Sequence, residues 1–173
     1  MDAIAQFQAV GPVLGGVVAG IDPADLDLPT PCREFTVRGV LEHVLAGATT
    51  FTAAFTDEAP GTVDLADPLT AFGPTLGGLG AAVTSPGALD RTIATPFGDQ
   101  PGEQFARYIV LDGLLHGWDL AQATGQSYEP PDELVTAVSD FAHQSLDGIR
   151  GAGSFGPVQP APAGASPIDA LAA

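Results

Sequence analysis

Residues 108–120 read YIVLDGLLHGWDL, and this stretch decides both the fold and the candidate functional residues of the 173-residue chain. When the stretch is wound at about 100° per residue, Asp112, His116 and Asp119 fall on one narrow stripe of a helix. Bulky apolar residues flank the stripe, and alanines and glycines occupy the opposite side. Carboxylates and an imidazole that are buried without partners destabilise a protein by several kcal/mol. Other parts of the chain must therefore satisfy them.

On both sides of this stretch, apolar residues recur at the spacing of an α-helix along most of the chain. Clusters of proline and glycine separate the expected helices. Thr36 and Asp67 are suitable N-caps, Asp67 being followed by a proline, and Gly125 is a suitable helix end. Gly11-Pro12 predicts a kink or break in the first helix. We expect helices over residues 3–20, 37–55, 67–83, 101–125 and from PPDELV at 130–135 to about 149.

Between the third and fourth helices the composition changes. Thr92 to Thr95 is of β type and is followed by the turn signal Pro96-Phe97-Gly98-Asp99, which predicts a short hairpin. The Gly-, Pro- and Ala-rich residues 151–173 predict an extended tail with a short terminal helix, packing Phe155 and Val158 back on the helices. The expected fold is an all-α bundle over residues 1–150 with one short β excursion, the tail not forming a separate domain.

The composition excludes several classes of partner. With 21 acidic residues against 5 arginines, the formal charge is −16, which argues against nucleic acid and anionic membranes and disfavours a highly anionic substrate. Cys32 is the single cysteine, so no intramolecular disulfide is expected. The start of the chain lacks a basic signal segment, and no apolar run reaches membrane-spanning length. We expect a cytoplasmic protein.

The stripe suggests a metal site once a third ligand is found. His43 lies in the helix over 37–55, between Gly39 and Gly47, which leave room for a ligand or for close helix contact. His143 falls off the apolar face of its helix and is expected to be exposed. An acid and a histidine at i, i+4 with a histidine from another helix suit Zn, Ni, Fe, Mn or Co and leave coordination positions open. Asp119 would orient a ligand, hold a metal-bound water or act as a base.

A structural alternative stays open. In this alternative, Asp112 accepts a hydrogen bond from Arg38 or Arg107, and His116 donates one to a backbone carbonyl. The stripe is then a satisfied polar network within the core. Independently of the stripe, Cys32 is interpreted as a small buried hydrophobic residue and Trp118 as a core residue. The acid-rich segment DEAPGTVDLAD at 57–67 is interpreted as a solvated loop.

Two segments resemble a known family. TPCREFTVRGVLEHVLAGA at 30–48 and YIVLDGLLHGWDLAQATGQ at 108–126 are similar to the signature segments of the DinB-like superfamily. The nearer likeness is to its actinobacterial branch, the mycothiol-dependent maleylpyruvate isomerase N-terminal domains. The resemblance implies an up-and-down four-helix bundle that holds a divalent metal, zinc first among the candidates, through His43, Asp112 and His116. It also implies a functional role for Asp119.

The resemblance further implies chemistry on a low-molecular-weight thiol. Characterised relatives activate such a thiol, mycothiol in this branch, at the metal for S-transfer or cis–trans isomerisation. The chain departs from the isomerase in having Asp112 in place of a glutamate and Cys32-Arg33-Glu34-Phe35 in place of Cys-Pro-Gly-Trp, and it ends without the C-terminal domain that supplies an active-site arginine. We therefore expect a metal-dependent thiol transferase acting on a small electrophile. The alternative is a metal-binding helical bundle without turnover. Separately, the glycine-rich apolar faces of the helices are compatible with a homodimer.

Overall fold

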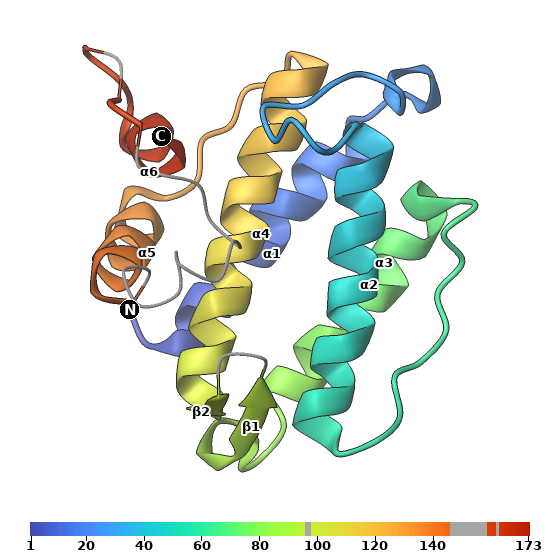
Figure 1. The fold of residues 1–173 in the computed structure, drawn as a ribbon, viewed down its shortest axis with the longest axis vertical. Coiled ribbons are helices and arrows are strands. Elements are labelled where there is room, and N and C mark those ends of the chain that lie inside the picture. The colour runs from blue at the N-terminus through green and yellow to red at the C-terminus, as the bar shows by residue number, and fades with distance from the viewer. Residues whose placement is uncertain (96–97, 146–158, 162) are drawn as a thin grey trace.

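A computed structural model describes residues 1–95, 98–145, 159–161 and 163–173, and it is mostly helical with one small two-stranded sheet (Figure 1). The helices are α1 (Ala3–Ala19), α2 (Val37–Thr56), α3 (Pro68–Val83), α4 (Gly102–Thr124), α5 (Asp132–Ser145) and α6 (Pro167–Ala172), with short 3₁₀ turns η1 (Pro23–Asp25) and η2 (Ala88–Asp90). Strands β1 (Thr92–Thr95) and β2 (Gly98–Pro101) form the predicted hairpin. The predicted helix end at 149 and the packing of Phe155 and Val158 lie outside the described residues.

The predicted helix ends are confirmed by their capping groups. The Thr36 hydroxyl accepts a hydrogen bond from the Gly39 amide at the start of α2, and the Asp67 carboxylate accepts from the Thr70 amide at the start of α3. Gly125 ends α4 at φ 67°, a left-handed conformation that glycine adopts at little cost.

The Gly11-Pro12 pair does not break the first helix. Helix α1 continues through Pro12, which removes one backbone donor and leaves the carbonyl of Gln8 without its helical partner. Gln8, Gly11 and Pro12 are all exposed. Water can therefore satisfy that carbonyl, and the helix tolerates the proline.

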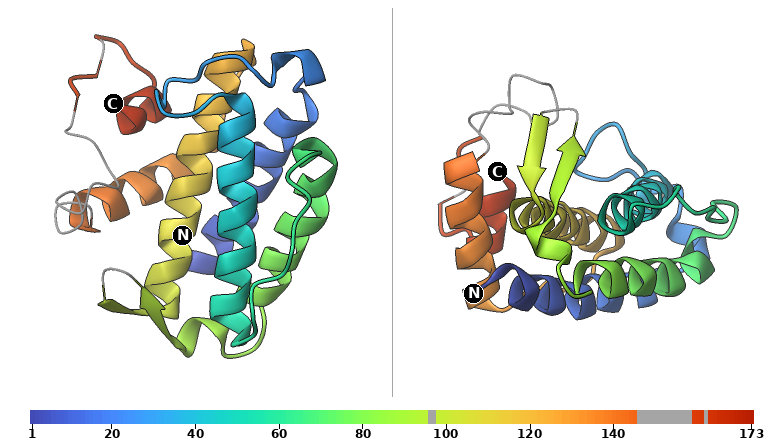
Figure 2. Two further views of the ribbon diagram at one scale, coloured as in Figure 1. Left: turned by 45° about the vertical axis from the view of Figure 1, so that its right-hand side comes forward. Right: turned by 90° about the horizontal axis from the view of Figure 1, so that it is seen from below.

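The strict up-and-down order of helices is wrong. The start of α2 (Val37 to Leu45) packs in one apolar cluster with Phe72 near the start of α3, while Phe55 at the end of α2 packs with Leu79 to Val83 at the end of α3. Helices α2 and α3 therefore run parallel, and α1 and α4 run the opposite way beside them (Figures 1 and 2). Residues 57–67 allow this course. They are exposed, as expected, except for Val63, which is half-buried against the core, and they return along the helices. Extended, they reach roughly 35 Å, more than the roughly 24 Å of α3.

Helix α4 lies at the centre of the fold and packs with its small residues toward α1. A Cβ added to Gly113 would lie 3.7 Å from Leu14 and 3.8 Å from Val10, an ordinary contact distance, so the glycine brings the two helices close. Of the bulky residues that flank the polar stripe, Ile109 is buried but Tyr108 and Leu115 are only half-buried. The sequence pattern predicted that the polar stripe is buried among these residues. The stripe instead lies at the edge of the core.

Helices α5 and α6 cover a second side of α4. Apolar residues of α5, α4 and α6 form one buried cluster, which includes Leu134, Val138, Leu111, Leu114 and Ile168. Helix α6 begins with a capping box, in which the Ser166 hydroxyl and the Asp169 carboxylate each bond the other's backbone amide. Among the described residues, no helix combines the length and the apolar character needed to cross a membrane.

Candidate metal centre

The three predicted ligands meet between α2 and α4. Nε2 of His43 lies 3.6 Å from Oδ1 of Asp112, and Nε2 of His116 lies 3.5 Å from the same oxygen. One donor atom from each of the three residues lies within 4.8 Å of the other two. The i, i+4 spacing on α4 brings Asp112 and His116 together, and the packing of α2 on α4 brings His43 to them.

The cluster is open on one side and closed on the other. The side chain of His43 is 43% exposed and that of Asp112 is 34% exposed, whereas that of His116 is 13% exposed. Three protein ligands at such an opening leave coordination positions for water or a substrate, which is the arrangement of catalytic rather than structural metal sites.

Asp119 orients His116 rather than joining the cluster. Its Oδ2 lies 3.1 Å from Nδ1 of His116, and Asp119 is buried. When Nδ1 carries the proton and donates it to Asp119, the lone pair of Nε2 faces Asp112 and His43. A carboxylate behind a histidine ligand is the usual second partner at metal sites. The sequence predicted that Asp119 would orient a ligand, hold a metal-bound water or act as a base. Its position corresponds to orienting a ligand.

The charges of the cluster reinforce one another. Burial opposes ionisation of Asp112, but hydrogen bonds from His116 and His43, with the charges of these imidazoles, outweigh it and hold the pKa of Asp112 well below its usual range. Burial also opposes the charged imidazole of His116, but the hydrogen bonds and charges of Asp112 and Asp119 raise the pKa of His116 to about 9. Without metal, Asp112 is therefore a carboxylate and His116 an imidazolium at neutral pH.

The partners proposed for a purely structural network are wrong. Arg107 pairs with Glu103 at 2.8 Å and Arg38 lies 3.9 Å from Glu42, so neither arginine reaches Asp112. His116 bonds a carboxylate and not a backbone carbonyl. His143, also on a helix, is exposed as expected.

Phe35 is a residue of the centre that sequence reasoning missed. Its ring centroid lies 5.4 Å from that of His43 and 6.5 Å from that of His116. A Cβ on Gly39 would lie 3.1 Å from the Phe35 ring, and one on Gly47 would lie 3.2 Å from Phe51. The two glycines beside His43 thus make room for aromatic rings, not for a ligand or another helix. An aromatic residue four positions before a helix glycine was the available signal.

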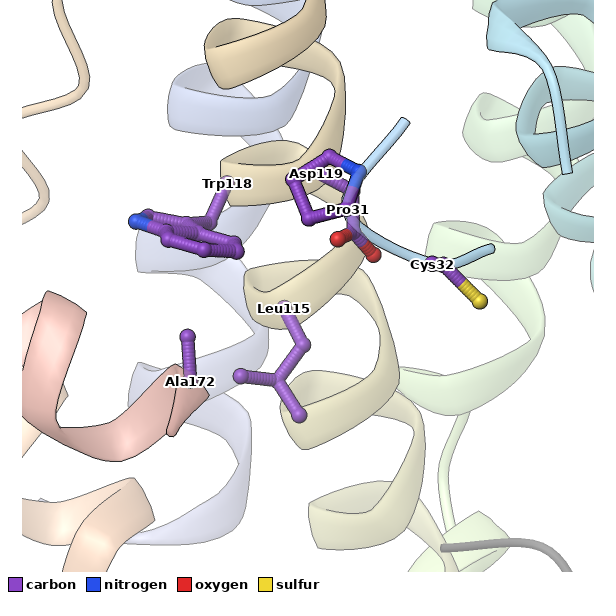
Figure 3. Close-up of a pocket in the computed structure, with 6 residues that line it drawn as sticks. All are labelled: Pro31, Cys32, Leu115, Trp118, Asp119 and Ala172. Atoms are coloured by element: carbon purple, nitrogen blue, oxygen red, sulfur yellow. The ribbon is translucent and has the colours of Figure 1, made fainter. Parts of the chain in front are cut away.

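A cavity of about 270 Å³ lies beside the centre (Figure 3). It is lined by Pro31, Cys32, Leu115, Trp118, Asp119 and Ala172. Trp118, expected in the core, is half-buried at the wall of this cavity, and its Nε1 donates to Oδ1 of Asp169 at 2.8 Å. Cys32, expected to be buried, is half-buried, and burial together with the charge of Asp119 raises the pKa of its thiol.

Comparison with known proteins agrees with the resemblance seen in the sequence. Residues 7–88 match the mycothiol maleylpyruvate isomerase N-terminal domain. Uncharacterized proteins of Mycobacterium tuberculosis strains CDC 1551 / Oshkosh and ATCC 25618 / H37Rv are each 33% identical over 179 residues, covering 100% of this chain and 96% of theirs. The chain belongs to the mycothiol maleylpyruvate isomerase N-terminal domain family.

Within this family match, only part of the centre is included. The matched residues contain His43 but not Asp112, His116 or Asp119, all of which lie on α4. The grouping of His43 with Asp112 and His116 therefore rests on the geometry of the folded chain. No solved structure matches the chain significantly.

Proposed function

We propose that this member of the mycothiol maleylpyruvate isomerase N-terminal domain family is a metal-dependent enzyme that transfers a low-molecular-weight thiol, of the mycothiol type, to a small electrophile. One observation carries the proposal. Two imidazoles and a carboxylate from two helices meet at a solvent-facing point, with a buried carboxylate behind one imidazole. The DinB type of four-helix bundle and a location in the cytoplasm, where thiols are kept reduced, belong to the same proposal.

The donor set suits a divalent metal, zinc first. Imidazole nitrogen and carboxylate oxygen are ordinary zinc ligands, and Oδ1 of Asp112 already lies about equally far from the two Nε2 atoms, although its side chain is one methylene shorter than the glutamate of the isomerase. A bound zinc ion lowers the pKa of a coordinated thiol and so supplies thiolate at neutral pH.

The residues of this chain hold and shape the centre. His43, Asp112 and His116 would hold the metal, and Asp119 keeps Nε2 of His116 directed at it. Phe35 packs against both imidazoles and restricts their orientation. Burial and the charge of Asp119 raise the pKa of the Cys32 thiol, which disfavours the protein's own cysteine as the nucleophile and favours a free thiol molecule.

Thiol consumption by zinc-loaded protein tests the proposal. The protein, with mycothiol, is assayed against a panel of small electrophiles beside His116→Ala and the matched control His143→Ala, an exposed histidine outside the cluster. We expect turnover in the wild type and the control, and none in His116→Ala. Zinc binding without thiol consumption above the His116→Ala background would instead favour a metal-binding protein without turnover.

A further inference from the structure

The cavity beside the metal centre has a size and position suited to the electrophile. At about 270 Å³ it lies just below the roughly 300–1,000 Å³ usual for ligand pockets, so it admits a small molecule. Figure 3 shows Trp118 and Ala172 on one side of it and Pro31 and Cys32 on the other. Asp119 lines the cavity and also bonds the ligand histidine His116, so a molecule in the cavity lies next to the centre.

The charges around the cavity oppose an anionic occupant. Among the part of the chain that the structure describes, no cationic residue lines the cavity, and Asp119 adds a carboxylate. A second carboxylate, Asp169, lies behind Trp118, and the hydrogen bonds from Trp118 and the Ser166 hydroxyl hold the pKa of Asp169 below its usual range. The net charge of −16 adds a repulsion of the same sign.

Helix α6 fixes the flat wall of the cavity. The Ser166 hydroxyl donates to Oδ2 of Asp169 at 2.7 Å, and Oδ1 of Asp169 accepts from the indole of Trp118 at 2.8 Å. Ile168 is buried in the cluster shared with α4 and α5, which anchors the helix. A fixed indole offers a planar apolar surface on which an unsaturated or aromatic group can stack.

We propose that this cavity binds the uncharged, planar and apolar part of the electrophile and discriminates against substrates that carry a carboxylate. The assignment of the occupant as the electrophile rests on the function proposed above. Binding to the cavity, by contrast, requires neither metal nor thiol. It can therefore be tested in the metal-free protein, and its failure is distinguishable from a failure of metal binding or of thiol transfer.

The experiment compares two probes of the same shape, neutral cinnamamide and anionic cinnamate, with the metal-free full-length protein. Trp118 is the single tryptophan of the chain, so its fluorescence reports the cavity directly, and calorimetry measures the affinity. We expect cinnamamide to bind at least tenfold more tightly than cinnamate, a difference of about 1.4 kcal/mol, and to change the Trp118 emission. Equal or tighter binding of cinnamate, no binding of either probe up to its solubility limit, or binding without a change in emission would overturn the proposal.

Two variants separate charge from shape. Ala172→Arg adds a cation at the cavity wall, at the end of α6, where a positive charge is compatible with the helix dipole. It should reduce or reverse the tenfold preference for cinnamamide over cinnamate. Asp169→Ala releases the indole and should weaken the binding of cinnamamide. Because it also removes a carboxylate near the cavity, it should weaken the binding of cinnamate less. Asp140→Ala, the loss of an exposed acid on another helix, should change neither. A preference unchanged by Ala172→Arg would contradict the assignment of charge as its cause.

Discussion

Raising the pH from 7 to 9 should strengthen zinc binding about 50-fold. In the metal-free protein, hydrogen bonds and charges of Asp112 and Asp119 overcome the effect of burial and raise the pKa of His116 to about 9. At pH 7 only about one molecule in a hundred then has a neutral His116, and a metal binds only the neutral imidazole. Binding must displace that proton. At pH 9 about half of the molecules have a neutral His116, so the gain in zinc affinity is about 50-fold, or about 2.3 kcal/mol.

Zinc affinity is measured at pH 7, 8 and 9 by competition with a chromophoric chelator calibrated at each pH. Calorimetry in buffers of different ionisation enthalpy counts the protons released. We expect about one proton from His116 at pH 7 and progressively fewer near pH 9, with the same behaviour in His143→Ala. An affinity that is flat between pH 7 and 9, or binding without proton release, would refute the reasoning, because an unperturbed histidine is already neutral in this range.

Three further predictions follow from the same contacts. The pKa of His116 in the folded state exceeds its ordinary value of 6.5, so the metal-free protein should lose up to about 3 kcal/mol of unfolding free energy as the pH rises from about 6.5 through 9. Urea titrations at several pH values measure this loss, and His116→Ala should not show it. Asp119→Ala should weaken zinc about 10- to 100-fold, and an unchanged affinity would show that Asp119 does not orient the ligand. Gly117→Ala should cost about 1–3 kcal/mol in urea unfolding because its Cβ would lie 2.5 Å from the hydroxyl oxygen of Tyr128, while Gly11→Ala, with open space around it, should not destabilise.

Local features of this chain could be predicted from the sequence. The caps at Thr36 and Asp67, the Gly125 helix end and the hairpin each depend on a few neighbouring residues. The pairing of Asp112 with His116 is equally local, because both lie one turn apart on one helix. The residues alone offered His43 as a candidate third ligand, and the family resemblance implied that it joins the other two, since helix periodicity does not say which helices are neighbours.

The features that were missed depend on contacts between distant segments. The parallel course of α2 and α3 follows from the length of residues 57–67, which was interpreted only as a solvated loop. The wall of the cavity depends on a hydrogen bond between Trp118 and Asp169, which are 51 residues apart. The tilted packing of Phe35 on His43 depends on how the loop before α2 folds back. Periodicity and capping patterns carry no information on such contacts.

The metal content of the purified protein tests the metal centre most directly. Wild type, His116→Ala and His143→Ala are prepared without an affinity tag and analysed by mass spectrometry. We expect about one divalent ion per chain in the wild type and in His143→Ala, and none in His116→Ala, because His116 is the ligand that Asp119 holds in place. A wild type that is purified without metal and does not bind zinc, nickel or manganese on titration would contradict the metal centre. Asp112, His116 and Asp119 would then form a structural polar network.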